Sequence, residues 1–171
     1  MRRFVSLIPI TLLLLAGLSA CGSKSSANQN KTLNVTLADE PATVDPNKDT
    51  DTNSASVIAQ TMEGLYTYSK SNKIIPGVAT KVVKPTNHGK TYTFTLKKTA
   101  KWANGQRVTA QDFVTSLRRM ADPTTKAQYA SVLSAFKNYN AVQHGKLAPS
   151  KLGITALSKT TVSYTHLRAH E

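Results

Sequence analysis

The sequence predicts an α/β fold in which strands and short helices follow one another along the chain. Apolar and polar residues alternate through residues 91–97. Tyr92, Phe94 and Leu96 would therefore share one face of a strand. A later segment, from Thr109, has helical spacing and clear signals at both ends. The part of the chain that follows an N-terminal leader, about 140 residues, is long enough for one domain.

Several elements are expected before that strand. Residues 32–38 alternate as a half-buried strand does, and residues 40–53, with two prolines and several Asp, Asn and Thr residues, are predicted to be a loop. Ser54 is the expected cap of a short helix that Gly64 would end. Residues 65–68 are predicted to form a second strand.

Turns and one loop are expected around residues 91–97. The run Ile-Ile-Pro-Gly at 74–77 predicts a turn, and Asn-His-Gly-Lys at 87–90 predicts a hairpin-type turn that leads into the strand. Trp102 and the pair Asn104-Gly105 are expected in a loop that precedes the helix.

The helix from Thr109 is the best-specified element. Thr109 is the expected N-cap, and Asp112 follows at the capping-box position. Val108 and Phe113 are spaced to form a hydrophobic staple. Asp122, which precedes a proline, is expected to end the helix.

The faces of this helix and the elements after it are also predicted. The expected buried stripe consists of Phe113, Leu117 and Met120. Arg118 and Arg119 are expected to point toward solvent. Residues 129–136 are a candidate second helix, and residues 151–157 a candidate short strand.

Residues 1–20 are predicted to be a lipoprotein signal peptide. Arg2 and Arg3 precede an apolar run of about a dozen residues, which is shorter than the ~20 residues that span a bilayer. The small residues Leu-Ser-Ala at 18–20 lead directly into Cys21, a pattern that resembles the bacterial lipobox. The resemblance implies cleavage before Cys21 and attachment of lipid to its sulfur.

Cys21 is the single cysteine of the chain, so it has no partner for an internal disulfide. A leftover structural cysteine is the alternative, but lipidation accounts for an odd thiol in a secreted protein. Residues 22–30 contain no aromatic or β-branched residue. We therefore expect residues 21–30 to be a flexible tether between the lipid and a folded domain.

The C-terminal end, SYTHLRAHE, resembles the translation of an adapter used in transposase-based sequencing libraries. We therefore expect residues 161–171 to derive from the adapter, although Val162 and part of Thr161 are compatible with either source. The native protein is expected to continue with a different sequence.

The chain is strongly basic, with a formal net charge of +13. Leaving Arg2, Arg3, Arg168 and Glu171 out of the 22 basic and 9 acidic residues leaves 19 and 8, a net charge of +11. The lysines are scattered along the chain and lack the aromatic interleaving that stacks bases, so no nucleic acid partner is expected. A solvated lysine-rich surface is the simplest interpretation, with anionic lipid or wall polymer as neighbours.

Five of those eight acidic residues gather within 13 positions; they are Asp39, Glu40, Asp45, Asp49 and Asp51. This acidic loop, residues 39–51, is open to three interpretations: it binds a cation, it binds the amine of a substrate, or it binds nothing. It lacks the glycine and the final glutamate of an EF-hand loop.

No catalytic pattern is visible in the sequence. His88 and His144 lie far apart, and no Ser, His and Asp spacing indicates a triad. The chain has neither a Cys/His cluster for a metal nor a glycine-rich phosphate loop. We expect a protein that is not an enzyme and that has no metal or other cofactor.

Four segments resemble the N-terminal part of extracellular solute-binding proteins of family 5, the oligopeptide-binding lipoproteins of ABC importers. They are ATVDPNKDTDTNSASVIAQTMEGLYTY, IIPGVATKV, YTFTLKKTAKWANGQRVTAQDFVTSLRRMADPTT and QYASVL. The similarity runs from about Leu33 to about Thr160, and KWANGQRVTAQDF is its most specific part.

The resemblance implies the N-terminal part of a type II periplasmic-binding-protein-like clam-shell, truncated before its second lobe. Residues 31–62 would be the first segment of lobe I, which contains a mixed sheet. Residues 63–160 would be the accessory α/β domain. Such receptors close around their ligand by a hinge motion.

By the same resemblance, the protein would be a lipid-anchored receptor on the extracellular or periplasmic face of the cell membrane. It would capture oligopeptides and deliver them to the permease subunits of an ABC transporter. Alternatives are a receptor for a sugar, a pheromone peptide or a metal complex, and a basic surface adhesin, which only the net charge favours.

The family's ligand contacts carry over to a few positions. Thr50 and Thr52 fall where ligand-lining residues lie, and Tyr129 falls on a cleft-facing aromatic residue of the accessory domain. Asp49 and Asp51 flank the two threonines and are candidates to hold the ammonium group of a peptide. A solvated acidic loop and core packing of Tyr129 are the alternatives.

Overall fold

The computed structural model describes residues 34–167. Residues 37–167 belong to one unit, and residues 34–36 belong to a second one. The predicted signal peptide, the lipidation site at Cys21, the tether and the end of the adapter-like segment lie outside the described residues.

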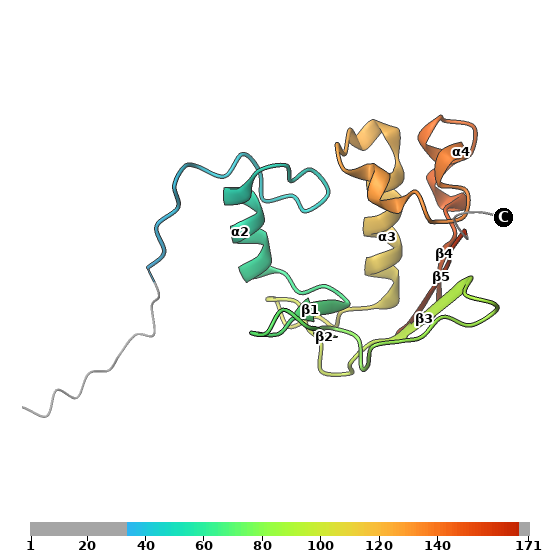
Figure 1. The fold of residues 1–171 in the computed structure, drawn as a ribbon, viewed down its shortest axis with the longest axis horizontal. Helices are drawn as coiled ribbons and strands as arrows, with labels where there is room; N and C mark the ends of the chain where they lie inside the picture. Colours follow the sequence, from blue (N-terminus) through green and yellow to red (C-terminus); the bar gives the residue numbers. More distant parts are fainter. Residues whose placement is uncertain (1–33, 168–171) are drawn as a thin grey trace, which may run out of the picture. The chain divides into compact units, whose positions relative to one another are not determined.

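A three-stranded antiparallel sheet forms one side of the core (Figure 1). Its order is β3 (Thr91–Thr95), β5 (Thr161–Thr165) and β4 (Ile154–Ser158), with β5 in the middle. These strands are rich in threonine and aromatic residues, which favour a pleated and half-buried surface. Helix α3 (Ala110–Ala121) packs against β4 and β5.

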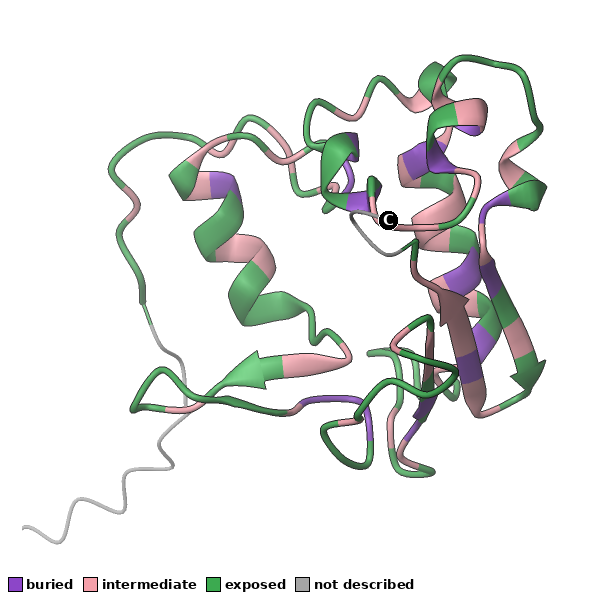
Figure 2. Ribbon diagram, turned by 45° about the vertical axis from the view of Figure 1, so that its right-hand side comes forward, coloured by how far each residue is buried: buried purple, intermediate pink, exposed green. Residues whose placement is uncertain are grey.

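The core lies where α3 meets this sheet, as the buried segments in Figure 2 show. Four of its side chains, each at most 1% exposed, are Leu96, Val114, Val142 and Val162. An aromatic group extends this core toward the first hairpin, since the rings of Tyr66 and Phe94 meet edge-on with centroids 5.7 Å apart. Burying apolar surface at this junction is the main force that holds α3 on the sheet.

A second, two-stranded sheet consists of β1 (Tyr66–Tyr68) and β2 (Ile74–Pro76). The chain that follows β2 returns past residue 64 so closely that a Cβ atom on Gly77 would lie 2.5 Å from the Gly64 carbonyl oxygen. Only glycine fits at position 77 for this reason. The amide of Lys97 then donates to the carbonyl oxygen of Val78, which ties this hairpin to the end of β3.

Short helices complete the structure. Helix α2 (Thr52–Thr61) follows the acidic loop, and Ser54 is its one buried residue. Helix α4 (Tyr139–Gln143) contributes Tyr139 and Val142 to the core. The single turns of 3-10 helix are η2 (Pro123–Thr125), η3 (Ala130–Leu133) and η4 (Pro149–Lys151).

The start and end of α2 differ from the expectation. The helix begins at Thr52 with Asp51 as its cap, and Ser54 lies inside it. The Asp51 carboxylate accepts from the amides of Asn53 and Ser54, which satisfies donors that a helix start leaves free. The helix ends at Thr61, before Gly64, because the backbone at Met62 is already extended.

Two predicted strand and turn assignments were wrong. The described part of residues 32–38 forms no strand, and Val35 is 70% exposed, because no described segment pairs with it. The turn expected at 74–77 is the strand β2, and the hairpin turns at residues 69–73 instead, where the Ser69 amide donates to the Lys73 carbonyl.

Other local predictions are confirmed. The strand expected at 65–68 is β1, and the strand expected at 91–97 is β3 with a shorter end. The turn at 87–90 has positive φ angles at Asn87, His88 and Gly89. The predicted loop before α3 turns at Gly105, whose φ is 85°.

Helix α3 has the predicted limits and capping box, since the Thr109 amide donates to Asp112 Oδ2 at 2.8 Å. Its buried residues are Ala110, Val114 and Ala121. The predicted stripe of Phe113, Leu117 and Met120 is only half-buried, and it lies beside these buried residues on the helix. Small side chains face the sheet because they let the helix approach its backbone closely.

Arg118 does not point toward solvent as expected. Its Nη2 atom donates to the carbonyl oxygen of Ile154 at 3.0 Å, and its Nε atom is buried without a partner among the described residues. Arg119, by contrast, is exposed. The two neighbouring arginines therefore have different roles, one on the sheet and one at the surface.

The elements after α3 are shorter than predicted. Residues 129–136 contain only the turn η3, and the strand expected at 151–157 begins at Ile154, after η4. At residue 153 the chain passes so close to Lys137 that a Cβ atom would lie 2.7 Å from the Lys137 Cβ. That close approach separates η4 from β4.

The adapter-like segment supplies the middle strand of the sheet. Thr161–Thr165 pair with β3 on one side and with β4 on the other, and Val162 is 1% exposed. The origin of residues 161–171 stays a prediction.

Candidate functional site

The acidic loop is fastened to α3 by a buried amide. Asn47 is 7% exposed, and its Nδ2 atom donates to the carbonyl oxygen of Ser116 at 3.1 Å. The Ser116 hydroxyl lies 3.4 Å from Asn47 Oδ1. A buried polar side chain with both ends paired holds its segment in one position.

A salt bridge makes the second attachment of the loop to α3. Arg119 Nη1 donates to Asp45 Oδ1 at 2.8 Å, and Arg119 Nη2 pairs with the other oxygen of the same carboxylate. The hydrogen bond from Arg119 lowers the pKa of Asp45 from 3.8 to about 2, against the opposing effect of burial. The amide of Asn47 donates to the same carboxylate and favours its charged form.

Asp51 is fully engaged at the start of α2. Its carboxylate accepts from the amides of Asn53 and Ser54 and from the Ser54 hydroxyl, and these bonds lower its pKa, the hydroxyl contributing most. The Ser54 hydroxyl oxygen in turn accepts from the Thr43 amide at 3.1 Å. Asp51 therefore has a structural role that the sequence analysis did not expect.

The remaining loop positions surround this cap. Asp49 is half-buried, and its Oδ1 atom accepts from the Asp51 amide at 3.2 Å. Thr50 and Thr52 are exposed on either side of Asp51. These four predicted contact residues are consecutive in the sequence, and they lie at the start of α2.

Tyr129 lies on a different element, directly before η3. Its side chain is 55% exposed, so it is not packed in the core. Within residues 34–167, no hydrogen bond or aromatic contact joins it to the acidic loop.

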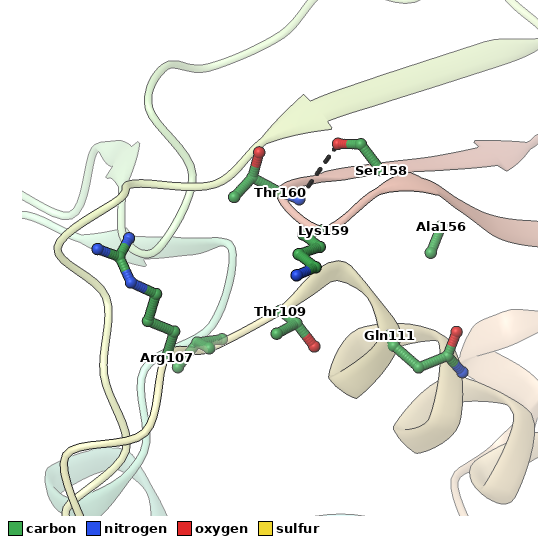
Figure 3. Close-up of a pocket in the computed structure, with 8 residues that line it drawn as sticks. Arg107, Thr109, Gln111, Ala156, Ser158, Lys159 and Thr160 are labelled. Atoms are coloured by element: carbon green, nitrogen blue, oxygen red, sulfur yellow. Dashed lines mark hydrogen bonds between the residues drawn. The ribbon is translucent and has the colours of Figure 1, made fainter.

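Two cavities, each of about 510 Å³, lie elsewhere in the unit. The first lies at the start of α3, where Figure 3 shows Arg107, Thr109 and Lys159 around it and the Thr160 amide donating to Ser158 Oγ. The second lies between α2 and the start of α3, and its lining is mainly apolar. Neither is lined by the predicted contact residues.

No group of histidine, cysteine and acidic side chains among residues 34–167 is arranged to hold a metal ion. No helix of the described part is long and apolar enough to cross a membrane.

Sequence reasoning missed the residues that position the loop, which are Asn47, Ser54, Ser116 and Arg119. A local signal existed for one of them. In the run Asp-Pro-Asn at 45–47, the Asn47 amide donates to the Asp45 side chain, which is the turn that an aspartate before a proline favours. The partners on α3 lie about 70 residues away, and no local pattern connects them to the loop.

The fold is that of part of a type II periplasmic binding protein. A crystal structure of an oligopeptide ABC transporter substrate-binding domain from Bacillus anthracis has a TM-score of 0.76 at 40% identity, covering 81% of this chain and 26% of that one. The murein tripeptide-binding protein MppA of Escherichia coli has a TM-score of 0.72 at 39% identity, covering 76% and 26%.

Sequence comparison identifies the family. The sequence model of the bacterial extracellular solute-binding proteins, family 5 middle part, matches residues 73–169. The chain belongs to this family. Curated relatives include the murein peptide-binding protein MppA of Escherichia coli, 41% identical over 128 residues, and the oligopeptide-binding protein OppA of Bacillus subtilis, 33% identical over 171 residues.

The chain spans only part of these relatives. The match with MppA covers 74% of this chain and 24% of MppA. The match with the Bacillus subtilis OppA covers 95% of this chain and 31% of that protein.

Proposed function

We propose that the protein captures peptides outside the cell and passes them to the permease subunits of an ABC transporter, acting by binding and not by catalysis. The observation that carries the proposal is the family, because relatives that match on sequence and on fold are named as peptide-binding proteins. The acidic loop supports it, because its attachments at Asp45, Asn47 and Asp51 hold the side chains of its second half in a fixed arrangement.

The proposed contacts are Asp49, Thr50, Asp51, Thr52 and Tyr129. At α2, the two threonine hydroxyls are exposed beside carboxylates, as a site for the amino end of a peptide requires. Asp49 is the better candidate for the ammonium group, because Asp51 already accepts hydrogen bonds from three donors. Tyr129 supplies an exposed ring from the accessory domain.

The test uses the complete protein encoded at the source locus. Binding of a pentapeptide and of its N-acetylated form is compared by calorimetry in the parent and in Asp49→Asn. The free peptide should lose about tenfold in affinity in the variant, while the acetylated peptide should lose little, because only the free form carries the charge. Asp39→Asn, an exposed acid of the same loop, is the matched control.

The possible results distinguish a failure of the proposed function from a failure of the proposed contact residues. Absence of peptide binding by the parent protein contradicts the proposed function. Equal losses for both peptides in Asp49→Asn reject only its part in amine recognition. Full affinity of Tyr129→Ala removes that residue from the contacts.

We also propose that the protein is held on the outer face of the cell membrane by a lipid on Cys21. The pattern at residues 18–21 supports this, together with the family's extracellular location.

A further inference from the structure

One part of the structure has an extreme charge. Between Glu63 and Asp112 the chain carries nine basic residues and no acidic one. We call residues 64–109 the basic layer; it contains the hairpin β1–β2, the strand β3 and the loops around them. Residues 123–167 also lack acidic residues, but they carry only five lysines, so the excess of positive charge is densest in the basic layer.

The backbone holds the basic layer together. Ala79 pairs with Leu96, and Lys101 pairs with Arg107, as isolated bridges between its segments. In Figure 1 the layer occupies the lower part of the unit, from β1 and β2 to the start of α3. All nine basic side chains except that of Lys97 are exposed, and the one salt bridge within residues 34–167 involves none of them.

The layer also exposes apolar side chains. On the hairpin, Tyr68 and Ile74 are direct cross-strand partners, 71% and 56% exposed, so they share one face. Lys70 and Lys73 lie in the turn that joins their strands. Trp102, in the loop before α3, is 48% exposed.

We propose that the basic layer is a contact surface for an anionic lipid bilayer, and that the hairpin β1–β2 makes the main contact. Lysines near such a surface are attracted by its phosphate groups. Tyrosine and tryptophan favour the boundary between headgroups and acyl chains. Charge alone would suit any polyanion, including a wall polymer, but the exposed Tyr68–Ile74 pair beside the lysines favours a surface with an apolar interior.

The predicted anchor is compatible with this contact. Cys21 lies 13 residues before the first described residue, Asn34, and a segment of that length spans at most about 45 Å. A lipid at Cys21 would keep the domain near the bilayer, so even a weak surface contact would be populated. The contact does not depend on the peptide-binding function.

The experiment measures vesicle binding without the anchor. The complete mature protein carrying Cys21→Ser is sedimented with vesicles of phosphatidylcholine, with or without an equal share of phosphatidylglycerol. Binding should require phosphatidylglycerol and should weaken about tenfold in Lys70→Gln/Lys73→Gln, since each lysine contributes several-fold. Lys146→Gln/Lys151→Gln removes the same charge from exposed positions outside the layer and should have a much smaller effect.

A second variant separates lipid from soluble polyanion. Tyr68→Ser should weaken vesicle binding and leave binding to soluble polyphosphate unchanged, because only the bilayer accepts the ring. Three binding results would overturn the proposal: no preference for phosphatidylglycerol, an equal loss of vesicle binding in the two lysine pairs, or unchanged vesicle binding in Tyr68→Ser. A strong loss of stability in Tyr68→Ser would also overturn it, because it would show that other parts of the protein cover the hairpin. Peptide affinity measured on the same variants should stay at the parent value, which keeps this result separate from the proposed function.

Discussion

The guanidinium of Arg119 on α3 holds the carboxylate of Asp45 in the acidic loop through two parallel donors. This is the one salt bridge among residues 34–167, and it joins positions 74 residues apart. Together with the buried Asn47–Ser116 contact, it fixes the position of the loop before α2 relative to α3. The position of the proposed peptide contacts depends on that attachment.

The salt bridge predicts a pH-dependent stability. The pKa of Asp45 in the folded protein is lowered from 3.8 to about 2, so its contribution is present above pH 3.8 and is lost as the pH falls toward 2. Asp45→Asn should lower the urea midpoint of unfolding slightly at pH 6 and by much less at pH 2, where the carboxyl is about half protonated in the folded protein. The effect is small because the Arg119 side chain is 46% exposed. Asp39→Asn is the control, and a difference that is constant with pH would exclude the salt bridge as its cause.

The cap of α2 predicts a distinction between two substitutions at Asp51. Asp51→Ala removes the acceptor for two amides, so it should lower the thermal midpoint by a few degrees. Asp51→Asn keeps an acceptor oxygen and should leave the midpoint near the parent value. Thr52→Ala, at the exposed neighbouring position, is the control. Equal midpoints for the two Asp51 variants would contradict the capping role.

The core predicts a large difference between two leucines. Leu96 is 1% exposed, and Leu96→Ala should lower the free energy of unfolding by about 2–5 kcal/mol because it leaves a cavity. Leu157 is 62% exposed, and Leu157→Ala should change it by no more than about 0.5 kcal/mol. Chemical denaturation of both variants provides the measurement. A loss for Leu96→Ala no larger than that for Leu157→Ala would be inconsistent with the packing.

The lipobox pattern predicts membrane attachment through one atom. The complete protein expressed in a bacterium should partition into a detergent phase, and Cys21→Ala should release it or leave the signal peptide uncleaved. Phase partition followed by mass spectrometry of the N-terminus measures both effects. Unchanged partition of the variant would refute lipidation at Cys21.

The sequence by itself determined the elements whose signals are local. The capping box of Thr109 and Asp112, the turn at 87–90 and the alternation around Phe94 each involve residues within a few positions of one another. Steric and hydrogen-bonding preferences over such short distances hold whatever the rest of the chain does. The candidate contact residues came from the family resemblance, and their role in binding stays a prediction.

Tertiary structure decided the remaining features, because each of them depends on a residue outside its own stretch of sequence. Ile74–Pro76 form a strand because Tyr66–Tyr68 offer them a pairing edge, although their own sequence suggests a turn. Arg118 turns inward because the Ile154 carbonyl oxygen, 36 positions later, accepts a hydrogen bond from its Nη2 atom, while its neighbour Arg119 pairs with Asp45 at the surface. Unpaired polar groups are costly to bury, so the partner of such a side chain is determined only when segments distant in the sequence pack together.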